Sequence, residues 1–322
     1  MGFPWFRNTI TKTRESICCL KIINKYKLRN FLKLSDSRII LYNQKKIILI
    51  YRISNNNISL ELELNLDYGI ENGYNYIVYE IDKDILLIGE IDLFLIDLKR
   101  NIKMLQRVNI NNKDKKDYHI LKSSNGLLII HFSEKIIIFD YNKNEKKLIK
   151  KDEFDIPNIS VKGLSELNNE NIIIGCNSCV YILNLKRKEI NNLKITNKGL
   201  GRTNNLIDNY YLISYLNSAD EKIYLDIYKI DLKEIKLIQT INLGHPYLIK
   251  QFIKLNDNKL IGNDIKGNIY EFNIEDYFHI SLKDILKGSD EGHVEDDINI
   301  YKYDDNKIII ISYDFIKIWE FD

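Results

Sequence analysis

The feature that most constrains this sequence is a short apolar run that recurs seven times along the chain. The runs read IILIYRI, LFLIDL, IIIFDY, VYILNL, YLDIYKI, GNIYEF and IKIWEF, and polar residues follow each one. Equivalent positions within them are Tyr51, Ile96, Phe139, Leu183, Tyr228, Tyr270 and Trp319, spaced 42 to 49 residues apart. A period in this range predicts an array of similar units that stack and bury a shared core.

A polar turn keeps the same register as the apolar runs. Clusters such as SDSR from residue 35, NNEN from 168 and DDNK from 304 are rich in the residues that favour turns between strands. Each turn precedes a second run such as RIILY, NIIIG or KIIII, which is β-branched and nearly continuous. Runs of this kind predict strands that are buried on both faces.

The last repeat, Gly292 to Asp322, carries the most specific motif. It contains a Gly-His pair, an alternating run, two turns and a closing Ile-Trp-Glu-Phe, and it resembles one WD repeat. The resemblance implies an all-β fold, a seven-bladed β-propeller of four-stranded antiparallel blades. It also implies a buried structural hydrogen-bond set, which falls here on His293, Ser312, Asp314 and Trp319. Blade six keeps His245 and Asp264, with Gly262 and Tyr270 at the other two positions.

The seventh repeat ends after its third predicted strand and therefore lacks an outer one. SICCLKII, Ser16 to Ile23, is a spare predicted strand near the other end of the chain. Propellers that resemble this chain are closed by an N-terminal strand, so we expect this segment to complete blade seven. Residues 16–322 are then predicted to form a single WD-like propeller domain. Residues 1–15 form an N-terminal arm, either a frayed or tucked end or a short aromatic anchor for a partner.

Two segments remain open at the level of sequence. The connection from Glu275 to His293 permits an outer strand followed by a loop, or a short helix. The pair Cys176 and Cys179 has the spacing of half a zinc site or of a redox pair, but it spans a predicted strand-to-strand turn. Cys18 and Cys19 belong to blade seven, across the ring, so we predict structural cysteines and no metal site.

Composition excludes several classes of function. The 47 Lys and Arg nearly balance the 45 Asp and Glu, so there is no strong nucleic-acid signal. No apolar run approaches the ~20 residues that a membrane-spanning helix needs, and no signal peptide is recognisable. We therefore expect a cytoplasmic or nuclear protein. The five histidines are spread over different repeats without metal or catalytic spacing, and we predict no enzyme activity and no cofactor.

Charged residues sort by the type of loop that carries them. The turns after the third strands of blades two to four form a candidate basic arc of Lys99, Arg100, Lys103, Lys143, Lys146, Lys147, Lys186, Arg187 and Lys188. The connections between blades, expected on the opposite face, hold the candidate partner-binding residues Tyr68, Glu71, Tyr74, Tyr247, Asp290, Glu291, Glu295, Asp296 and Asp297. An acidic, Tyr-rich mouth of this kind suits a basic peptide.

The resulting hypothesis is a non-catalytic scaffold or adaptor, monomeric within a larger complex, that binds protein partners of unknown identity. One alternative is a substrate receptor of a ubiquitin ligase. Such receptors resemble WD repeats with Arg two places after the Asp, whereas Asp97 is followed here by Leu98, Lys99 and Arg100. The other alternative is a propeller that binds phosphoinositides or a membrane surface through the basic arc, although the Phe-Arg-Arg-Gly motif of those propellers is absent.

Overall fold

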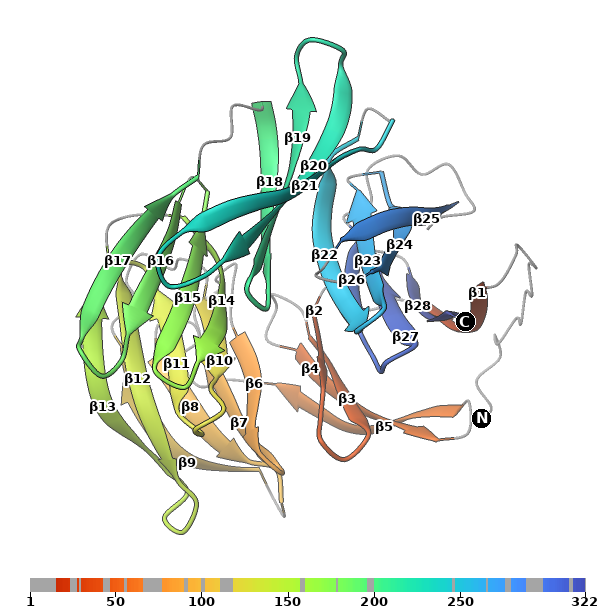
Figure 1. Ribbon diagram of the computed structural model, residues 1–322. Helices are drawn as coiled ribbons and strands as arrows, with labels where there is room; N and C mark the ends of the chain where they lie inside the picture. Colours follow the sequence, from red (N-terminus) through yellow and green to blue (C-terminus); the bar gives the residue numbers. More distant parts are fainter. Residues whose placement is uncertain are drawn as a thin grey trace.

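The protein is a seven-bladed β-propeller in a computed structural model (Figure 1). The structure describes residues 16–23, 28, 30–42, 47–54, 57–65, 77–89, 92–99, 102–110, 118–156, 160–177, 179–195, 200–244, 247–264, 266–275, 279–287, 298–312 and 315–321. These residues contain 28 strands and no helix. The strands form seven four-stranded antiparallel sheets, as the period predicted.

The first six blades are consecutive meanders. Blade one comprises β2 (Asn30–Lys33), β3 (Arg38–Tyr42), β4 (Ile47–Ser54) and β5 (Asn57–Asn65). Blade two comprises β6 (Ile77–Asp82), β7 (Ile85–Gly89), β8 (Asp92–Asp97) and β9 (Lys103–Asn109). Blade three comprises β10 (Tyr118–Lys122), β11 (Leu128–Phe132), β12 (Lys135–Asn142) and β13 (Lys147–Asp155).

The remaining blades follow the same order of strands. Blade four comprises β14 (Val161–Asn168), β15 (Asn171–Cys176), β16 (Cys179–Asn184) and β17 (Glu189–Lys194). Blade five comprises β18 (Leu200–Ile207), β19 (Tyr210–Asn217), β20 (Lys222–Ile230) and β21 (Ile235–Asn242). Blade six comprises β22 (Ile249–Asn256), β23 (Lys259–Asp264), β24 (Asn268–Ile274) and β25 (Ile280–Lys287). The ambiguous connection after Glu275 thus contains an outer strand, β25.

Blade seven takes strands from both ends of the sequence, as predicted. It contains β26 (Asn299–Lys302), β27 (Lys307–Ile311) and β28 (Phe315–Phe321), and its outer strand is β1 (Ser16–Ile23). The register runs from Ser16 opposite Phe321 to Ile23 opposite Phe315. Figure 1 shows β1 beside β28, close to the C-terminus. The predicted arm, residues 1–15, lies outside the described residues.

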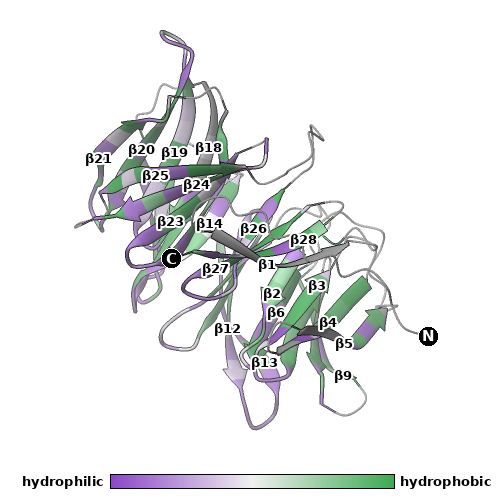
Figure 2. Cartoon of the chain, turned by 90° about the vertical axis from the view of Figure 1, so that its right-hand side faces the viewer, coloured by the Kyte–Doolittle hydropathy of each residue, from purple (hydrophilic) through white to green (hydrophobic). Residues whose placement is uncertain are grey.

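Seven apolar clusters hold the ring together, one at each interface between neighbouring blades. Successive side chains of a strand point to opposite faces of the sheet, so a middle strand contributes side chains to the clusters on both sides of its blade. In β3, for example, Ile40 packs toward blade two and Ile39 toward blade seven. This is why the middle strands are continuously apolar, while hydrophilic residues gather at the turns (Figure 2). Each such Ile contributes about 1.5–3 kcal/mol on burial, and a charge in its place would oppose closure of the ring.

The antiparallel order also sorts the loops into two faces. The first strands of neighbouring blades contact one another, which makes them the inner strands. The first turns of all blades and the third turns of blades one to six lie at one end of the strands, and we call this side the turn face. The second turns and the connections between blades lie at the other end, which we call the connection face. Among the candidate residues that the structure describes, those of the basic arc therefore belong to the turn face and Tyr247 belongs to the connection face.

Candidate protein-interaction surface

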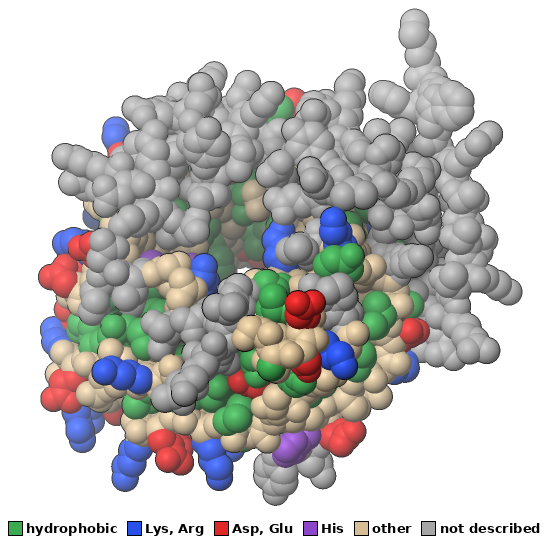
Figure 3. Space-filling model, turned by 90° about the horizontal axis from the view of Figure 1, so that it is seen from above, with side chains coloured by type: hydrophobic (Ala, Val, Ile, Leu, Met, Phe, Trp, Pro, Cys, Tyr) green, Lys and Arg blue, Asp and Glu red, His purple; other side chains and the backbone are tan. Residues whose placement is uncertain are grey.

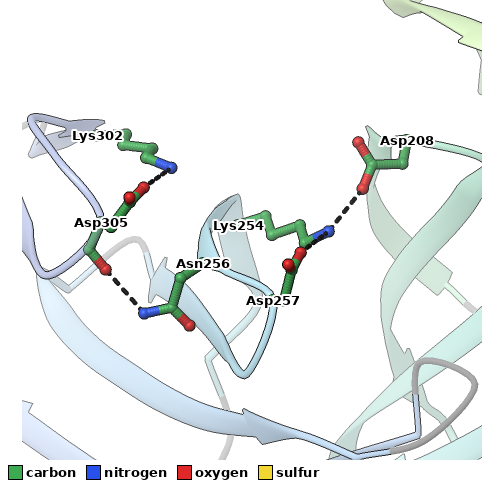
Figure 4. Close-up of a pocket in the computed structure, with 6 residues that line it drawn as sticks. All are labelled: Asp208, Lys254, Asn256, Asp257, Lys302 and Asp305. Carbon is green, nitrogen blue, oxygen red and sulfur yellow. Dashed lines mark hydrogen bonds and ion pairs between the residues drawn. The ribbon is translucent and has the colours of Figure 1, made fainter.

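An open depression of about 370 Å³ lies on the turn face, where blades five, six and seven meet (Figure 4). Asp208 comes from the first turn of blade five, Asp257 from that of blade six and Asp305 from that of blade seven. The inner strands β22 and β26 supply the remaining lining residues, Lys254, Asn256 and Lys302. Three blades thus contribute to one polar site, which sequence reasoning missed because its residues are far apart in the chain.

Ion pairs organise the depression and leave its carboxylates facing outward. The Lys254 ammonium lies 3.0 Å from Asp208 and 3.0 Å from Asp257, and the Lys302 ammonium lies 2.9 Å from Asp305. Burial opposes the charge on Lys254, but its hydrogen bonds to Asp257 and Asp208 hold its pKa above the usual value. The side chains of Asp257 and Asp305 remain 94% and 87% exposed. Three carboxylates against two ammonium groups give the depression a net negative charge.

The inner edge of the turn face is tied together by contacts between neighbouring blades. Asn256 donates a hydrogen bond of 2.8 Å from its side chain to the Asp305 carbonyl. Elsewhere a serine of the first turn binds a glutamate on the next inner strand. Ser35 donates to Glu80 from its backbone N–H (2.7 Å) and its hydroxyl (3.0 Å), and Ser124 donates to Glu166 in the same way. Hydrogen bonds between neighbouring blades therefore hold the inner strands in place beside the depression.

The predicted basic arc lies on the turn face of blades two to four, and much of its charge is paired. The Lys146 ammonium lies 2.5 Å from Asp97 of blade two, and that of Lys188 lies 2.7 Å from Asp152 of blade three. Two more arc residues, Lys99 and Lys186, lie 3.7 Å from carboxylates of their own blades. Arg100 is outside the described residues, and the other described members are Lys103, Lys143, Lys147 and Arg187.

These pairings lower the pKa of two carboxyl groups. A hydrogen bond from Lys188 lowers the pKa of Asp152. Burial would raise the pKa of Asp97, but hydrogen bonds from Lys146 and from the Lys99 backbone hold it below its usual value. In the view from above, Lys and Arg side chains alternate with Asp and Glu along the periphery of the described surface (Figure 3). Through the pairs of Lys146 with Asp97 and of Lys188 with Asp152, the arc links blade three to blade two and blade four to blade three.

Of the predicted partner-binding residues, only Tyr247 lies within the described part of the chain. Its side chain is 36% exposed, and the Lys266 ammonium lies 6.0 Å from the centre of its ring. The other eight candidates are outside the described residues: Tyr68, Glu71, Tyr74, Asp290, Glu291, Glu295, Asp296 and Asp297. The acidic mouth on the connection face therefore stays a prediction.

The predicted hydrogen-bond set of blade seven is described only in part. Ser312 and Trp319 are both buried, and the Trp319 indole N–H has no hydrogen-bond partner among the described residues. His293 and Asp314 lie outside those residues.

Blade six preserves a related arrangement. The Tyr270 hydroxyl donates a bond of 2.7 Å to the buried Asp264 carboxylate, which also accepts from the Asn268 side chain and from two backbone N–H groups. Tyr270 and Asp264, which the sequence analysis singled out in blade six, are thus bonded to each other.

A similar buried carboxylate in blade five escaped the sequence analysis. Asp226 lies on β20 and accepts hydrogen bonds from Thr240 at 2.7 Å, Tyr228 at 3.3 Å and Tyr215 at 3.4 Å. Burial and the Asp226 charge raise the pKa of Tyr215 to about 12. The available signal was the Asp inside the apolar run YLDIYKI, because a carboxylate within a buried strand needs hydrogen-bond donors.

The thiols of blade four have no feature of a reactive site. Cys176 and Cys179 are free and buried at the ends of β15 and β16, on a strand-to-strand turn as predicted. Burial and the neighbouring Cys179 raise the pKa of Cys176, which disfavours the thiolate that metals and electrophiles need. Within the described part of the chain, no three His, Cys, Asp or Glu side chains are arranged so that they could hold a metal ion.

The histidines require one correction. His119 and His131 belong to the same blade, because they face each other across β10 and β11, with ring centres 5.7 Å apart. Their spacing of twelve residues spans a hairpin, which the assignment to different repeats overlooked. Each ring contacts a backbone carbonyl, that of Val161 at 3.2 Å for His119 and that of Ser133 at 3.0 Å for His131. Both rings are thus held by main-chain partners.

Comparisons with known proteins bear on the fold. No protein-family model and no curated protein matches the chain by sequence. Among solved structures 1031 chains match, so the architecture is shared too widely to indicate a function. One of them, the crystal structure of Kluyvelomyces marxianus Hsv2, has a TM-score of 0.56 and 13% identity over 88% of each chain. At this identity the likeness shows the propeller fold alone. No helix in the described part of the chain is long and apolar enough to cross a membrane.

Proposed function

We propose that the chain is a WD-repeat-type propeller that acts as a non-catalytic scaffold and binds basic segments of partner proteins on its turn face. The observation that carries the proposal is the depression between blades five and seven. There Asp257 and Asp305 are almost fully exposed, while Lys254 and Lys302 fix the geometry around them. A Lys- or Arg-rich segment would find carboxylates from three blades within one site.

Two further observations support parts of this proposal. The last repeat resembles a WD repeat, and the buried bond between Asp264 and Tyr270 matches the type of hydrogen-bond set that the family carries. The two sides of the turn face also differ, because the lysines on blades two to four are largely paired with carboxylates, whereas the depression on blades five to seven has one more carboxylate than ammonium groups. Such a surface can orient a partner as well as bind it.

The test is titration of the purified chain with a Lys/Arg-rich peptide, followed by fluorescence anisotropy at low and high salt. Asp257→Asn combined with Asp305→Asn should weaken binding about three- to tenfold, because ion pairs at an exposed site are each weak. Asp155→Asn is the matched control, since this carboxylate is also 87% exposed but lies at the connection-face end of β13. Loss of binding in Glu291→Gln with Asp296→Asn instead would move the site to the connection face.

A further inference from the structure

The outer strand of blade four differs from the other outer strands of the ring. In six blades the outer strand shifts register against its neighbour, which marks an extra residue in the ladder. The shifts lie at Ile50/Tyr51, Leu95/Ile96, Ile138/Phe139, Ile227/Tyr228, Glu271/Phe272 and Cys18/Leu20. Among the described outer strands only β17 has unbroken register, from Glu189 opposite Asn184 to Lys194 opposite Cys179.

This difference decides which edges can accept another strand. A bulge bends the strand and breaks the alternation of its outward N–H and C=O groups, and it is one of the devices that protect sheet edges. β17 lacks that protection. Every second residue of this six-residue strand points its backbone N–H and C=O groups away from β16. These groups have the regular spacing that hydrogen bonding to an added strand requires.

Neighbouring blades hold β17 in position for such pairing. Ile190 packs against the cluster between blades three and four, and Leu193 against the cluster between blades four and five. The Asn192 side chain donates a bond of 3.4 Å to the Tyr181 hydroxyl within the blade. Because both faces of the strand are anchored, its edge is ordered before any ligand arrives.

Charges at the two ends of β17 define the ligand. Lys188 is paired with Asp152, and Lys186 lies near Glu170. Arg187, in the turn before the strand, and Lys194, its last residue, are exposed and have no carboxylate partner among the described residues. A second copy of the chain is the alternative occupant, because antiparallel two-fold pairing over the whole strand would set Lys194 of each copy opposite the exposed Glu189 of the other.

We propose that the edge of β17 binds an extended, acidic segment of a partner protein, which adds a strand to blade four through main-chain hydrogen bonds. Acidic residues at the ends of the segment meet Arg187 and Lys194. The site is separate from the acidic depression, because it lies on the outer rim of another blade and takes a ligand of opposite charge.

The probe is a synthetic peptide of about ten residues, with aspartates at both ends and alternating Thr and Val between them, a length that suits one strand. We expect binding by the wild-type chain and slower amide hydrogen exchange confined to residues 189–194. Arg187→Ser combined with Lys194→Ser should weaken binding about three- to tenfold. Lys236→Ser, at an exposed cation on the bulged strand β21, is the matched control and should bind like the wild type.

A second variant tests the edge itself. One alanine inserted between Ile190 and Asn191 reproduces the bulge of the other blades and should weaken binding more than about tenfold. Its melting temperature reports whether the blade still folds.

The proposal is overturned if the wild type does not bind the probe, if exchange at 189–194 is unchanged, or if an insertion variant that melts like the wild type binds equally. Dimers that the insertion abolishes would assign the edge to a second copy instead. Asp257→Asn with Asp305→Asn should leave binding of this probe intact, which separates the two sites.

Discussion

The side-chain amide of Gln239 donates a hydrogen bond of 2.8 Å to the Ile280 carbonyl and accepts one of 2.8 Å from the Ile280 N–H. One glutamine on the outer strand of blade five therefore pairs with the backbone of blade six as a peptide group would. Gln106 makes the same pair of bonds with Leu148 of blade three, and Gln251 makes it with Ile300 of blade seven. These hydrogen bonds add to the apolar clusters, because they fix the position of one blade relative to the next at three interfaces of the ring.

Replacing Gln239 tests whether this pairing stabilises the ring. Gln239→Ala leaves the half-buried N–H and C=O of Ile280 without their partner, which should cost about 1–3 kcal/mol of unfolding free energy. Urea denaturation measures the change. Gln251→Ala should have a similar effect, whereas Lys236→Ala on the same strand as Gln239 should be close to neutral. Equal midpoints for all three variants would mean that water replaces the amide without loss.

Ring closure can be tested by shortening the chain. Removal of residues 1–24 deletes β1 and exposes the edge of β28, beside the buried Trp319 and Phe321. We expect the melting temperature to fall by about ten degrees or more, because a lost strand removes several kcal/mol. Removal of residues 1–15 alone is the control and should change it little. Identical melting of the two shortened chains would contradict the role of β1.

The buried carboxylate of blade six gives a third prediction. Tyr270→Phe removes one donor from Asp264, a side chain that is only 1% exposed, and should cost about 1–2 kcal/mol. Burial and the bond to Asp264 raise the pKa of Tyr270, so its phenol should not ionise before alkaline unfolding. Chemical denaturation and ultraviolet titration check the two statements. Tyr224→Phe, which breaks an exposed bond to Asp220, should be milder.

The pair between Lys188 and Asp152 predicts a dependence of stability on pH. The pKa of Asp152 is lowered by the Lys188 hydrogen bond, so the folded state favours the ionised carboxyl. The stabilisation is present above the ordinary carboxyl pKa of about 4 and is lost as the pH falls through the lowered value. The wild type should therefore exceed Asp152→Asn in melting temperature at pH 7, by a small margin, and the two should converge in acid. A constant difference would exclude this ion pair as the cause.

Local pattern predicted the fold because six of the seven blades are each formed by four consecutive strands. The turn at 304–307 and the run that follows it determine a hairpin, and a spare apolar strand at Ser16–Ile23 has one open edge to fill. The segment after Glu275 was ambiguous because the apolar spacing in YFHISLKDIL suits a helix as well as a strand. Pairing with β24 decides in favour of the strand.

The candidate sites were less predictable because they depend on how blades meet. The sequence indicates that Lys146 lies in a basic turn, but its pairing with Asp97 depends on the distance between two blades. Asp208, Asp257 and Asp305 occupy equivalent turns, yet nothing local shows that three such turns surround one depression. The unbroken register of β17 likewise could not be predicted, because it is recognised only by comparison with the register shifts of the six other outer strands.

Because β1 pairs with β28, blade seven is the last blade that can form while the chain is being synthesised. Strand β1 is the first of the described strands to be made, and its partner is the last, so this contact has the greatest separation along the chain. Non-local pairing of this kind slows folding, and an apolar strand without a partner is prone to aggregate. A growing chain therefore carries SICCLKII unpaired until six blades have formed. We expect a circular permutant that begins at β2 and ends with β1 after β28 to shorten this interval, because the two strands would then be made one after the other.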